Sequence, residues 1–512
     1  MKTKSIFLIV TLLVFCTIIR AQDDLEKWLN KEQRDLEKFL SKEDKEFMEF
    51  LKKEWKEFEM SQGLTFYQKP KPLKLPVYTP PENEEIRNEE EKSRLIEEFP
   101  ESPEQGDNKE PIRNNKTGEE TTHFEAEEIP VTDRGALMID PVKNPVSIDL
   151  DFYGVIKEVK ISNDLRIKLN DDPDGESISD FWGEMASINF ADFLLQTNYY
   201  SEQMNLNDWG YCMLLNDLAN DIYGKAKNEK NLFLWFMLNK SGYKAKVGLI
   251  DDDVHLFLAA SNRLYGVPYF TMDNEEERLY VVDFDNFGAS VNGKLYTYEE
   301  DYEGANNLID MNVYKPMQIN NELDEKKLTF SYKGTDYTVP VKINQSNITF
   351  YKNYPYSNLD IYFNAAVNRD TYLSLVKSFE NILDGKSQAA AANILLRFAQ
   401  TAFAYEADLP NFGREKPLFV EETVYYNKSD CEDRSILFAY LVKNILNLDV
   451  LAITYPGHCA TAVKFKEKVG GDYLRYKGEN YVICDPTYIN ADAGMTMAKY
   501  KGVKISKIYE IK

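Results

Sequence analysis

The chain has 512 residues, a formal net charge of -24 and five cysteines. This acidic balance argues against nucleic acid and anionic membrane surfaces as partners and favours solubility. The length allows two to four domains with hydrophobic cores of their own. The few cysteines exclude a disulfide scaffold, and three histidines leave few candidates for a zinc site or a histidine-based catalyst.

Residues 1–21 have the pattern of an export signal: a short basic start, an apolar run over 6–19, and Ala21 before a cleavage point. The apolar run is shorter than the roughly 20 residues that a membrane-spanning helix needs, although an uncleaved anchor remains an alternative. Cys16 belongs to the apolar run rather than to a lipid-attachment site, because bulky Phe15 precedes it. The mature protein is therefore expected in the periplasm, the cell envelope or the extracellular space.

Residues 22–62 contain an 11-residue repeat that predicts a single amphipathic helix. Leu25, Leu36, Phe47 and Phe58 recur at one position of the repeat, and eleven residues over three turns is close to the period of an unstrained helix. Such a helix can pack on its own protein, or it can self-associate or dock on a partner as in a coiled coil. Both interpretations remain open.

The remaining chain divides by composition into four parts. Residues 63–144 are rich in proline and charge, which predicts a largely disordered linker. Mixed helical and strand patterns over 145–312 predict an α+β domain. Residues 313–368 read as a small β module with Lys333-Gly334 as a turn, and helical periodicity returns in the final part, 369–512.

Three short segments of the final part carry residues suited to thiol chemistry. Cys431 lies at the start of a predicted helix, where the helix dipole favours a thiolate, although the neighbouring acidic residues oppose it. His458 begins a predicted strand, and Asp485 ends another before a proline. A thiol nucleophile needs a base, and the base needs a third group that orients it. Cys431, His458 and Asp485 supply this set.

The segments DCEDRSILFAYLV (430–442), GHCATAV (457–463) and YVICDPTYI (481–489) resemble the transglutaminase-like superfamily in its secreted bacterial form. The resemblance covers about residues 370–500. It implies a papain-like fold with Cys431 as the nucleophile, His458 as the general base and later acid, and Asp485 as the orienting group. The backbone N–H of Cys431 would serve the oxyanion hole, with Gln400 as a candidate side-chain donor.

The spacing of His458 and Asp485 fits facing antiparallel strands with a turn at 470–472, and Lys477-Gly478 is a second candidate turn. In the first register Cys459 and Cys484 would lie opposite each other. They would then form either a cross-strand disulfide or two buried free thiols.

An imperfect copy of the site pattern precedes it in the sequence. Residues 231–250 parallel the helix and strand of 436–453, His255 lies near the start of a strand, and Asp283 follows another. The nucleophile is missing, because the matching helix start reads KAKNEKN. Residues 145–312 are thus expected to be a degenerate transglutaminase-like domain with a structural His255, or an unrelated α+β domain.

The chemistry expected from the site is acyl transfer through a thioester. Resolution by water makes the protein a peptidase or amidase, which we favour, whereas a lysine-like amine acceptor makes it a crosslinking transglutaminase. The competing class is an envelope scaffold that binds without catalysis. The expected partner is a protein or peptide substrate. No dinucleotide, phosphate-loop or metal-ligand motif is present, so no cofactor and no metal are predicted.

Overall fold

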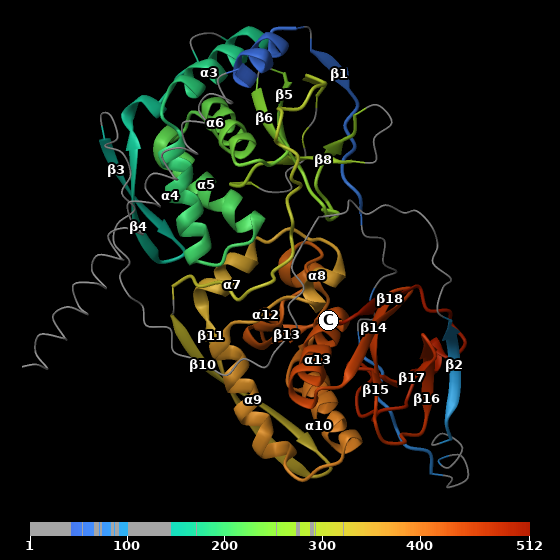
Figure 1. Ribbon diagram of the computed structural model, residues 1–512. Coiled ribbons are helices and arrows are strands. Elements are labelled where there is room, and N and C mark those ends of the chain that lie inside the picture. The colour runs from blue at the N-terminus through green and yellow to red at the C-terminus, as the bar shows by residue number, and fades with distance from the viewer. Residues whose placement is uncertain are drawn as a thin grey trace, which may run out of the picture.

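The computed structural model describes residues 42–100 and 145–512, except for positions 54, 66–70, 72–73, 83–86, 88–91, 170–171, 252, 273–276, 287–290, 292 and 321. The predicted export signal and the first part of the repeat helix lie outside these residues. The chain is α+β, as predicted, and folds into two halves (Figure 1).

The first half combines a hairpin, a group of helices and a sheet. The hairpin is β3 (Pro145–Phe152) and β4 (Val155–Ser162). The helices are η1 (Asn163–Leu165), α3 (Gly175–Ser187), α4 (Ala191–Gln203), α5 (Asp208–Tyr223) and α6 (Lys227–Lys240). The sheet contains β5 (Ala245–Ile250), β6 (Asp253–Ala259), β7 (Tyr269–Phe270), β8 (Leu279–Val282) and β9 (Leu295–Thr297).

The second half repeats this plan. Its hairpin is β10 (Leu323–Tyr332) and β11 (Thr335–Asn344), and β12 (Ala404–Tyr405) and β13 (Lys428–Ser429) form a short parallel pair. Its helices are α7 (Gln345–Lys352), α8 (Leu359–Phe363), α9 (Arg369–Leu383), α10 (Gln388–Thr401), α11 (Asp408–Phe412), α12 (Val420–Tyr425) and α13 (Cys431–Leu446). Its sheet contains β14 (Asp449–Tyr455), β15 (His458–Lys464), β16 (Asp472–Tyr476), β17 (Glu479–Cys484) and β18 (Lys507–Glu510), with η2 (Ala498–Tyr500) between the last two.

The two halves share one topology. The sheet orders are β9-β5-β6-β8-β7 and β18-β14-β15-β17-β16, so each runs fifth, first, second, fourth, third in chain order. In both halves a long helix, α6 or α13, contacts the first two strands, and a preceding helix, α5 or α10, contacts the hairpin and the long helix. This is the arrangement that an internal repeat produces.

The hairpin β10–β11 has its turn at Lys333-Gly334, as the sequence predicted, with Tyr332 paired to Thr335. The expectation of a separate β module over 313–368 is wrong, however. β10 contacts α10, β11 contacts α9, and the hairpin matches β3–β4 of the first half. It is therefore part of the second half and contributes Leu328 and Phe330 to its core.

The described part of the repeat helix packs on its own chain. It covers residues 42–51, and Phe47 and Leu51 are buried in the core of the first half, with the Phe47 ring 4.8 Å from that of Trp182. The helix ends earlier than the predicted residue 62. Residues of β1 (Lys56–Phe58) pair instead with β9, because an open sheet edge satisfies their backbone groups and outweighs helix propensity.

The expectation of a disordered linker over 63–144 is wrong for two described segments. Val77 forms a parallel bridge with Ile489, and β2 (Arg94–Phe99) adds a parallel strand to the outer edge of β16 (Figure 1). Composition missed both segments because their stability comes from backbone pairing with distant residues rather than from their own hydrophobicity.

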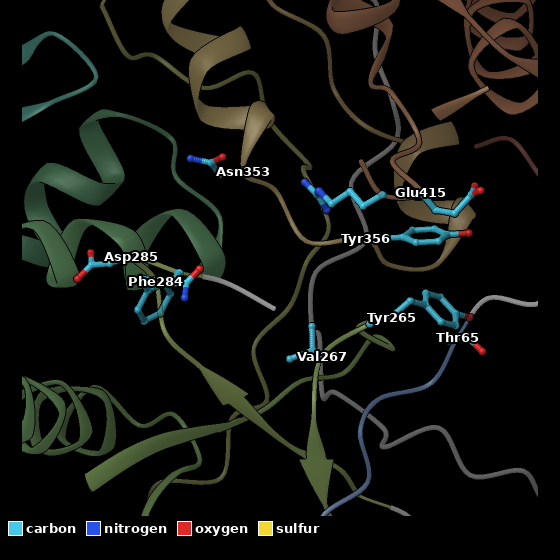
Figure 2. Close-up of a pocket in the computed structure, with 11 residues that line it drawn as sticks. Thr65, Tyr265, Val267, Phe284, Asp285, Asn353, Tyr356 and Glu415 are labelled. Carbon is cyan, nitrogen blue, oxygen red and sulfur yellow. The ribbon is translucent and has the colours of Figure 1, made fainter. Parts of the chain in front are cut away.

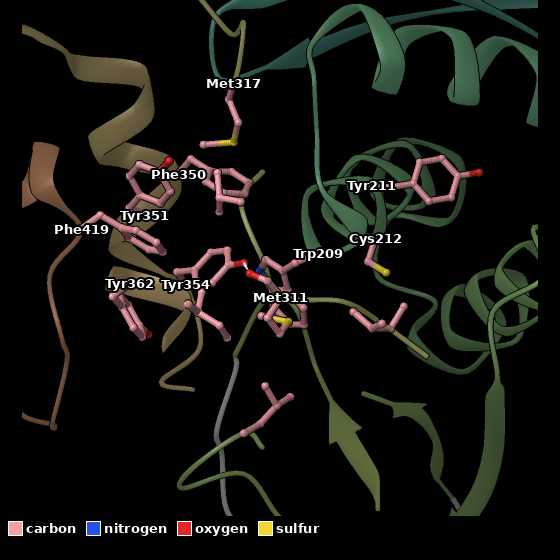
Figure 3. Packing of buried hydrophobic residues seen from close by; sticks show 14 of the residues in the cluster. Trp209, Tyr211, Cys212, Met311, Met317, Phe350, Tyr351, Tyr354, Tyr362 and Phe419 are labelled. Carbon is pink, nitrogen blue, oxygen red and sulfur yellow. Dashed lines mark hydrogen bonds between the residues drawn. The ribbon is translucent and has the colours of Figure 1, made fainter. Parts of the chain in front are cut away.

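A continuous apolar cluster joins the two halves. Trp209, Met311 and Met317 of the first half meet Phe350, Tyr354 and Phe419 of the second (Figure 3). Within this cluster the amide of Asn207 donates to the Tyr354 hydroxyl at 2.7 Å. A shared core of this kind holds the halves in a fixed relation to each other.

Candidate active site

His458 is positioned by the tight turn between β14 and β15. Pro456-Gly457 forms the turn, Gly457 has φ 75°, and Tyr455 pairs directly with His458. Glycine suits this left-handed conformation because it has no Cβ to clash. The imidazole is 4% exposed and its Nε2 is 2.9 Å from Oδ2 of Asp485. That bond leaves Nδ1 as the nitrogen that can serve a thiol.

Asp485 directly follows β17 and is fixed by three hydrogen bonds. Besides His458, the backbone N–H and the hydroxyl of Thr487 donate to its Oδ1 at 2.9 and 2.8 Å. Burial alone would raise the pKa of Asp485, but the charge and hydrogen bond of His458, with the Thr487 bonds, lower it. The carboxylate therefore stays ionised beside the imidazole, as the predicted orienting role requires.

Cys431 is the first residue of α13 and is 1% exposed. Its thiol donates to Oε2 of Glu432 at 3.0 Å. Burial, followed by the charges of Glu432 and Asp430, raises its pKa well above the ordinary value. Among the described residues the ring of His458 bonds to Asp485 and not to Cys431. The thiol is therefore covered, and the acidic neighbours outweigh the helix dipole in setting its pKa.

Tyr500 covers the imidazole and was not found from the sequence. Its ring is stacked on His458 with centroids 4.6 Å apart and planes at 5°, and it stacks on Tyr455 at 4.9 Å. Tyr500 belongs to η2, in the stretch that returns the chain to β18. The stacked tyrosine ring limits rotation of the imidazole and excludes water from it. Only the tertiary fold brings Tyr500 to His458, so the sequence did not reveal this contact.

Gln400 has a different role from the predicted oxyanion donor. Its amide nitrogen donates to the carbonyl oxygens of Asp485 at 3.2 Å and Ala491 at 2.9 Å. Its amide oxygen accepts from Arg397 at 2.9 Å and from the Asn490 backbone at 3.2 Å. Both amide hydrogens are thus engaged, and the side chain holds the loop that carries Asp485.

The predicted pairing of Cys459 with Cys484 is wrong. β15 and β17 pair with Thr461 opposite Cys484, and β16 lies between them in the sequence. The hairpin turn is therefore Lys477-Gly478 between β16 and β17, not residues 470–472. Cys459 and Cys484 are two buried free thiols, the second of the alternatives left open by the sequence.

An acidic pocket surrounds the start of α13 and holds Lys71. The Nζ of Lys71 lies 3.5 Å from Asp408 and 3.1 Å from Glu415, and it forms closer ion pairs with Asp430 and Glu432. The Lys71 side chain is 3% exposed. Burial alone would lower its pKa, but Glu432 and Asp430 raise it far above the ordinary value, so the ammonium stays charged.

One lysine does not neutralise the whole pocket. Burial, with neighbouring carboxylates, raises the pKa of Asp408 to about 8 and that of Asp433 to about 7. The pKa of Glu432 is lowered instead, because the charge of Lys71 and several hydrogen bonds outweigh the effect of burial. Carboxylate oxygens of Asp408, Glu415 and Glu432 lie within 4.8 Å of one another, a spacing that suits a cation, and the ammonium takes that position here.

No sequence pattern pointed directly to Lys71, which lies about 360 positions before Cys431. The available signal was indirect. Cys431, at the predicted helix start, is flanked by the carboxylates of Asp430, Glu432 and Asp433. A cysteine shielded from water there takes these carboxylates into the interior with it, and buried carboxylates need a counter-ion. The counter-ion comes from the supposed linker.

The raised pKa values of these buried carboxyl groups predict that the protein is more stable at pH 5 than at pH 8. Burial raises the pKa of Asp217 and Glu421 to about 7, as for Asp433, and that of Asp408 to about 8. Between about pH 4 and pH 8 the folded state keeps protons that the unfolded chain releases, so the free energy of unfolding falls as pH rises. Urea titrations at both pH values test this.

The control for the pH prediction is Asp217→Asn, at a residue outside the acidic pocket. This substitution should reduce the dependence of the free energy of unfolding on pH by the part that Asp217 contributes. Asp485 acts in the opposite sense, because its pKa is lowered in the folded state. It stabilises the fold above the ordinary pKa of an aspartate, and this contribution is lost only as pH falls below that value. A free energy of unfolding that rises from pH 5 to pH 8 would contradict the assignment.

The first half places different groups at the matching positions. α6 begins with Lys227 where α13 begins with Cys431, and the Lys227 ammonium is 3.0 Å from Asp283. His255 lies in β6 next to the Leu256–Val282 pair, and burial, followed by the charge of Lys227, lowers its pKa. Lys227 therefore stands in the first half at the position that Cys431 takes in the second, and a degenerate transglutaminase-like domain stays a prediction.

Comparisons with protein-family models, with curated proteins and with solved structures return no match. None of the helices in the described part of the chain has the length and apolar character needed to cross a bilayer.

Proposed function

We propose that the protein is an exported thiol hydrolase with a transglutaminase-like, papain-like catalytic half, in which Cys431, His458 and Asp485 cleave peptide or carboxamide bonds. The observation that carries the proposal is the buried 2.9 Å pair between His458 and Asp485, because His458 begins β15 and this strand contacts α13, whose first residue is Cys431. A base oriented by an ionised carboxylate next to a cysteine is the arrangement that nucleophilic acyl transfer needs.

In the proposed reaction His458 takes the thiol proton, and the Cys431 sulfur attacks the carbonyl carbon. The tetrahedral oxyanion is stabilised by backbone N–H groups at the start of α13, which have no partner within the helix. The C–N bond then breaks as His458 returns the proton to the leaving amine, giving a thioester. Water, deprotonated by His458, attacks the thioester, and the sulfur leaves as the acid is released.

A second candidate is a binding scaffold without catalysis. It is favoured by one observation: the Cys431 thiol is covered and bonded to Glu432 rather than to His458. Catalysis requires that the hydrogen bond between the Cys431 thiol and Glu432 break, so that the sulfur can turn toward Nδ1 of His458.

The deciding measurement is the rate of Cys431 alkylation by iodoacetamide from pH 4 to pH 9 in the intact protein and in His458→Ala. The covered thiol should react slowly in the intact protein, but its rate should already be independent of pH below pH 7 and should lose this profile in the variant, because the imidazolium stabilises the thiolate whenever the site opens. Slow alkylation with an ordinary thiol pH profile in both proteins would favour the scaffold. Cys431→Ser identifies the alkylated residue among the four described cysteines.

A further inference from the structure

The N-terminal segment contacts the candidate site at two places. Lys71 enters the acidic pocket at the start of α13, next to Cys431. Six positions later Val77 bridges to Ile489, in the loop that follows Asp485. We call Lys71 and residues 74–78 the strap.

The strap binds as an extended peptide binds. The N–H of Tyr78 donates to the carbonyl of Ile489 at 2.7 Å, and the N–H of Ile489 donates to the carbonyl of Pro76 at 3.1 Å. The ring of Tyr78 lies 5.8 Å from that of Tyr488, edge to face. Backbone pairing supplies affinity without regard to sequence, whereas side-chain pockets supply selectivity.

The side-chain pocket of the strap is the acidic one. Four carboxylates converge on the single ammonium of Lys71. Oδ1 of Asp430, in a residue that is 0% exposed, has no hydrogen-bond partner among the described residues. The pocket therefore has acceptor capacity beyond what Lys71 uses, which suits a basic group with several donors.

The pocket is reached from solvent. A cavity of about 540 Å³ opens between the two halves, and its lining includes Tyr265 and Asp285 of the first half and Tyr356 and Glu415 of the second (Figure 2). Glu415 also binds Lys71, and its side chain is 40% exposed, so the cavity adjoins the acidic pocket at this residue. A peptide entering between the halves would meet Asp285 of the first half and Glu415 of the second, together with the guanidinium of Arg414.

We propose that the acidic pocket is a recognition subsite for a lysine or arginine side chain of a peptide, and that the strap occupies it as an internal ligand that keeps Cys431 covered. The catalytic consequence rests on the proposed function, whereas the binding of a basic peptide does not. A basic side chain that replaces Lys71 takes over its ion pair with Glu432, and the displaced strap no longer covers the way to the thiol.

The test is the binding of a labelled, acetylated peptide KPLKLPVYTP, a copy of residues 71–80, measured by fluorescence anisotropy at pH 7. Full-length Lys71→Met should bind it at least tenfold more tightly than the unaltered protein, because its pocket is vacant. A peptide with norleucine in place of the first lysine should bind at least tenfold more weakly. Lys74→Met is the matched control, since Lys74 is exposed on the same segment, and should behave as the unaltered protein.

Equal affinity for the lysine and norleucine peptides, or no gain in Lys71→Met, would overturn the proposal. If Lys71→Met does not fold, the unaltered protein decides: millimolar lysine peptide should accelerate iodoacetamide alkylation of Cys431 at pH 8, and the norleucine peptide should not. Acceleration by both peptides or by neither would refute the subsite.

The two proposals fail separately. Lysine-selective binding in a Cys431→Ser background, with an ordinary alkylation profile in the intact protein, would leave the subsite standing and remove the enzyme. A thiolate that depends on His458 without lysine-selective binding would leave the enzyme standing and remove the subsite.

Discussion

Lys71→Met should lower the free energy of unfolding by about 3–5 kcal/mol at pH 7, the range for a buried ion pair that loses one partner. The side chain is 3% exposed, and its removal leaves Asp430 and Glu432 without their cation. Glu432 would then have to take up a proton on folding, which costs about 1.4 kcal/mol for each pH unit above its ordinary pKa. Urea denaturation followed by circular dichroism measures the loss.

Two further variants identify the cause of this loss. Adding Glu432→Gln to Lys71→Met should restore much of the stability, because the uncompensated carboxylate is gone. Lys428→Met breaks an exposed ion pair with Glu406 and should cost less than about 1 kcal/mol. The penalty of Lys71→Met should also shrink as pH falls from 8 to 5, since protonation of the acids becomes easier. A penalty independent of pH would point to lost packing instead.

Asp485→Asn should slow acylation of Cys431 by about 10³–10⁴-fold, the scale seen when the carboxylate of such a triad becomes an amide. The amide can still bond to the ring, but it cannot stabilise the imidazolium, and it favours the wrong tautomer of His458. The measurement is the burst of p-nitrophenol from p-nitrophenyl acetate, together with the iodoacetamide pH profile.

Asp492→Asn is the matched control for Asp485→Asn. Asp492 lies in the same loop but accepts from the Tyr332 hydroxyl at 3.0 Å, outside the triad. It should leave both readouts within about twofold of the unaltered protein. Equal slowing by the two variants would mean that the loop, rather than the carboxylate beside His458, controls reactivity.

The sequence was most informative where the chemistry is local. The Pro456-Gly457 turn and the strand-ending proline after Asp485 predicted where His458 and Asp485 lie, and the structure brings them to 2.9 Å. Lys333-Gly334 likewise marked its hairpin turn. Glycine and proline restrict the backbone at their own positions, so such features can be read without knowledge of distant residues.

The sequence failed where the structure depends on pairing between distant segments. The register of β15 with β17 was wrong because a third strand, β16, separates them and two turn signals competed. Lys71 and β2 were missed because a charged, proline-rich stretch has little burial signal of its own. The Cys431 environment was only half predicted: the acids were visible, but their bond to the thiol and their lysine counter-ion were not.

The placement of β1 and β2 bears on how the protein avoids aggregation. β1 covers the outer side of β9 and β2 covers the outer side of β16, at opposite ends of the two matching sheets. Open strand edges template pairing with other chains. In the described part of the chain β1 and β2 are the outermost strands on these sides. A shorter chain beginning at Pro145 would instead expose the backbone groups of β9 and β16 that now pair with them, and it should tend to polymerise through these strands.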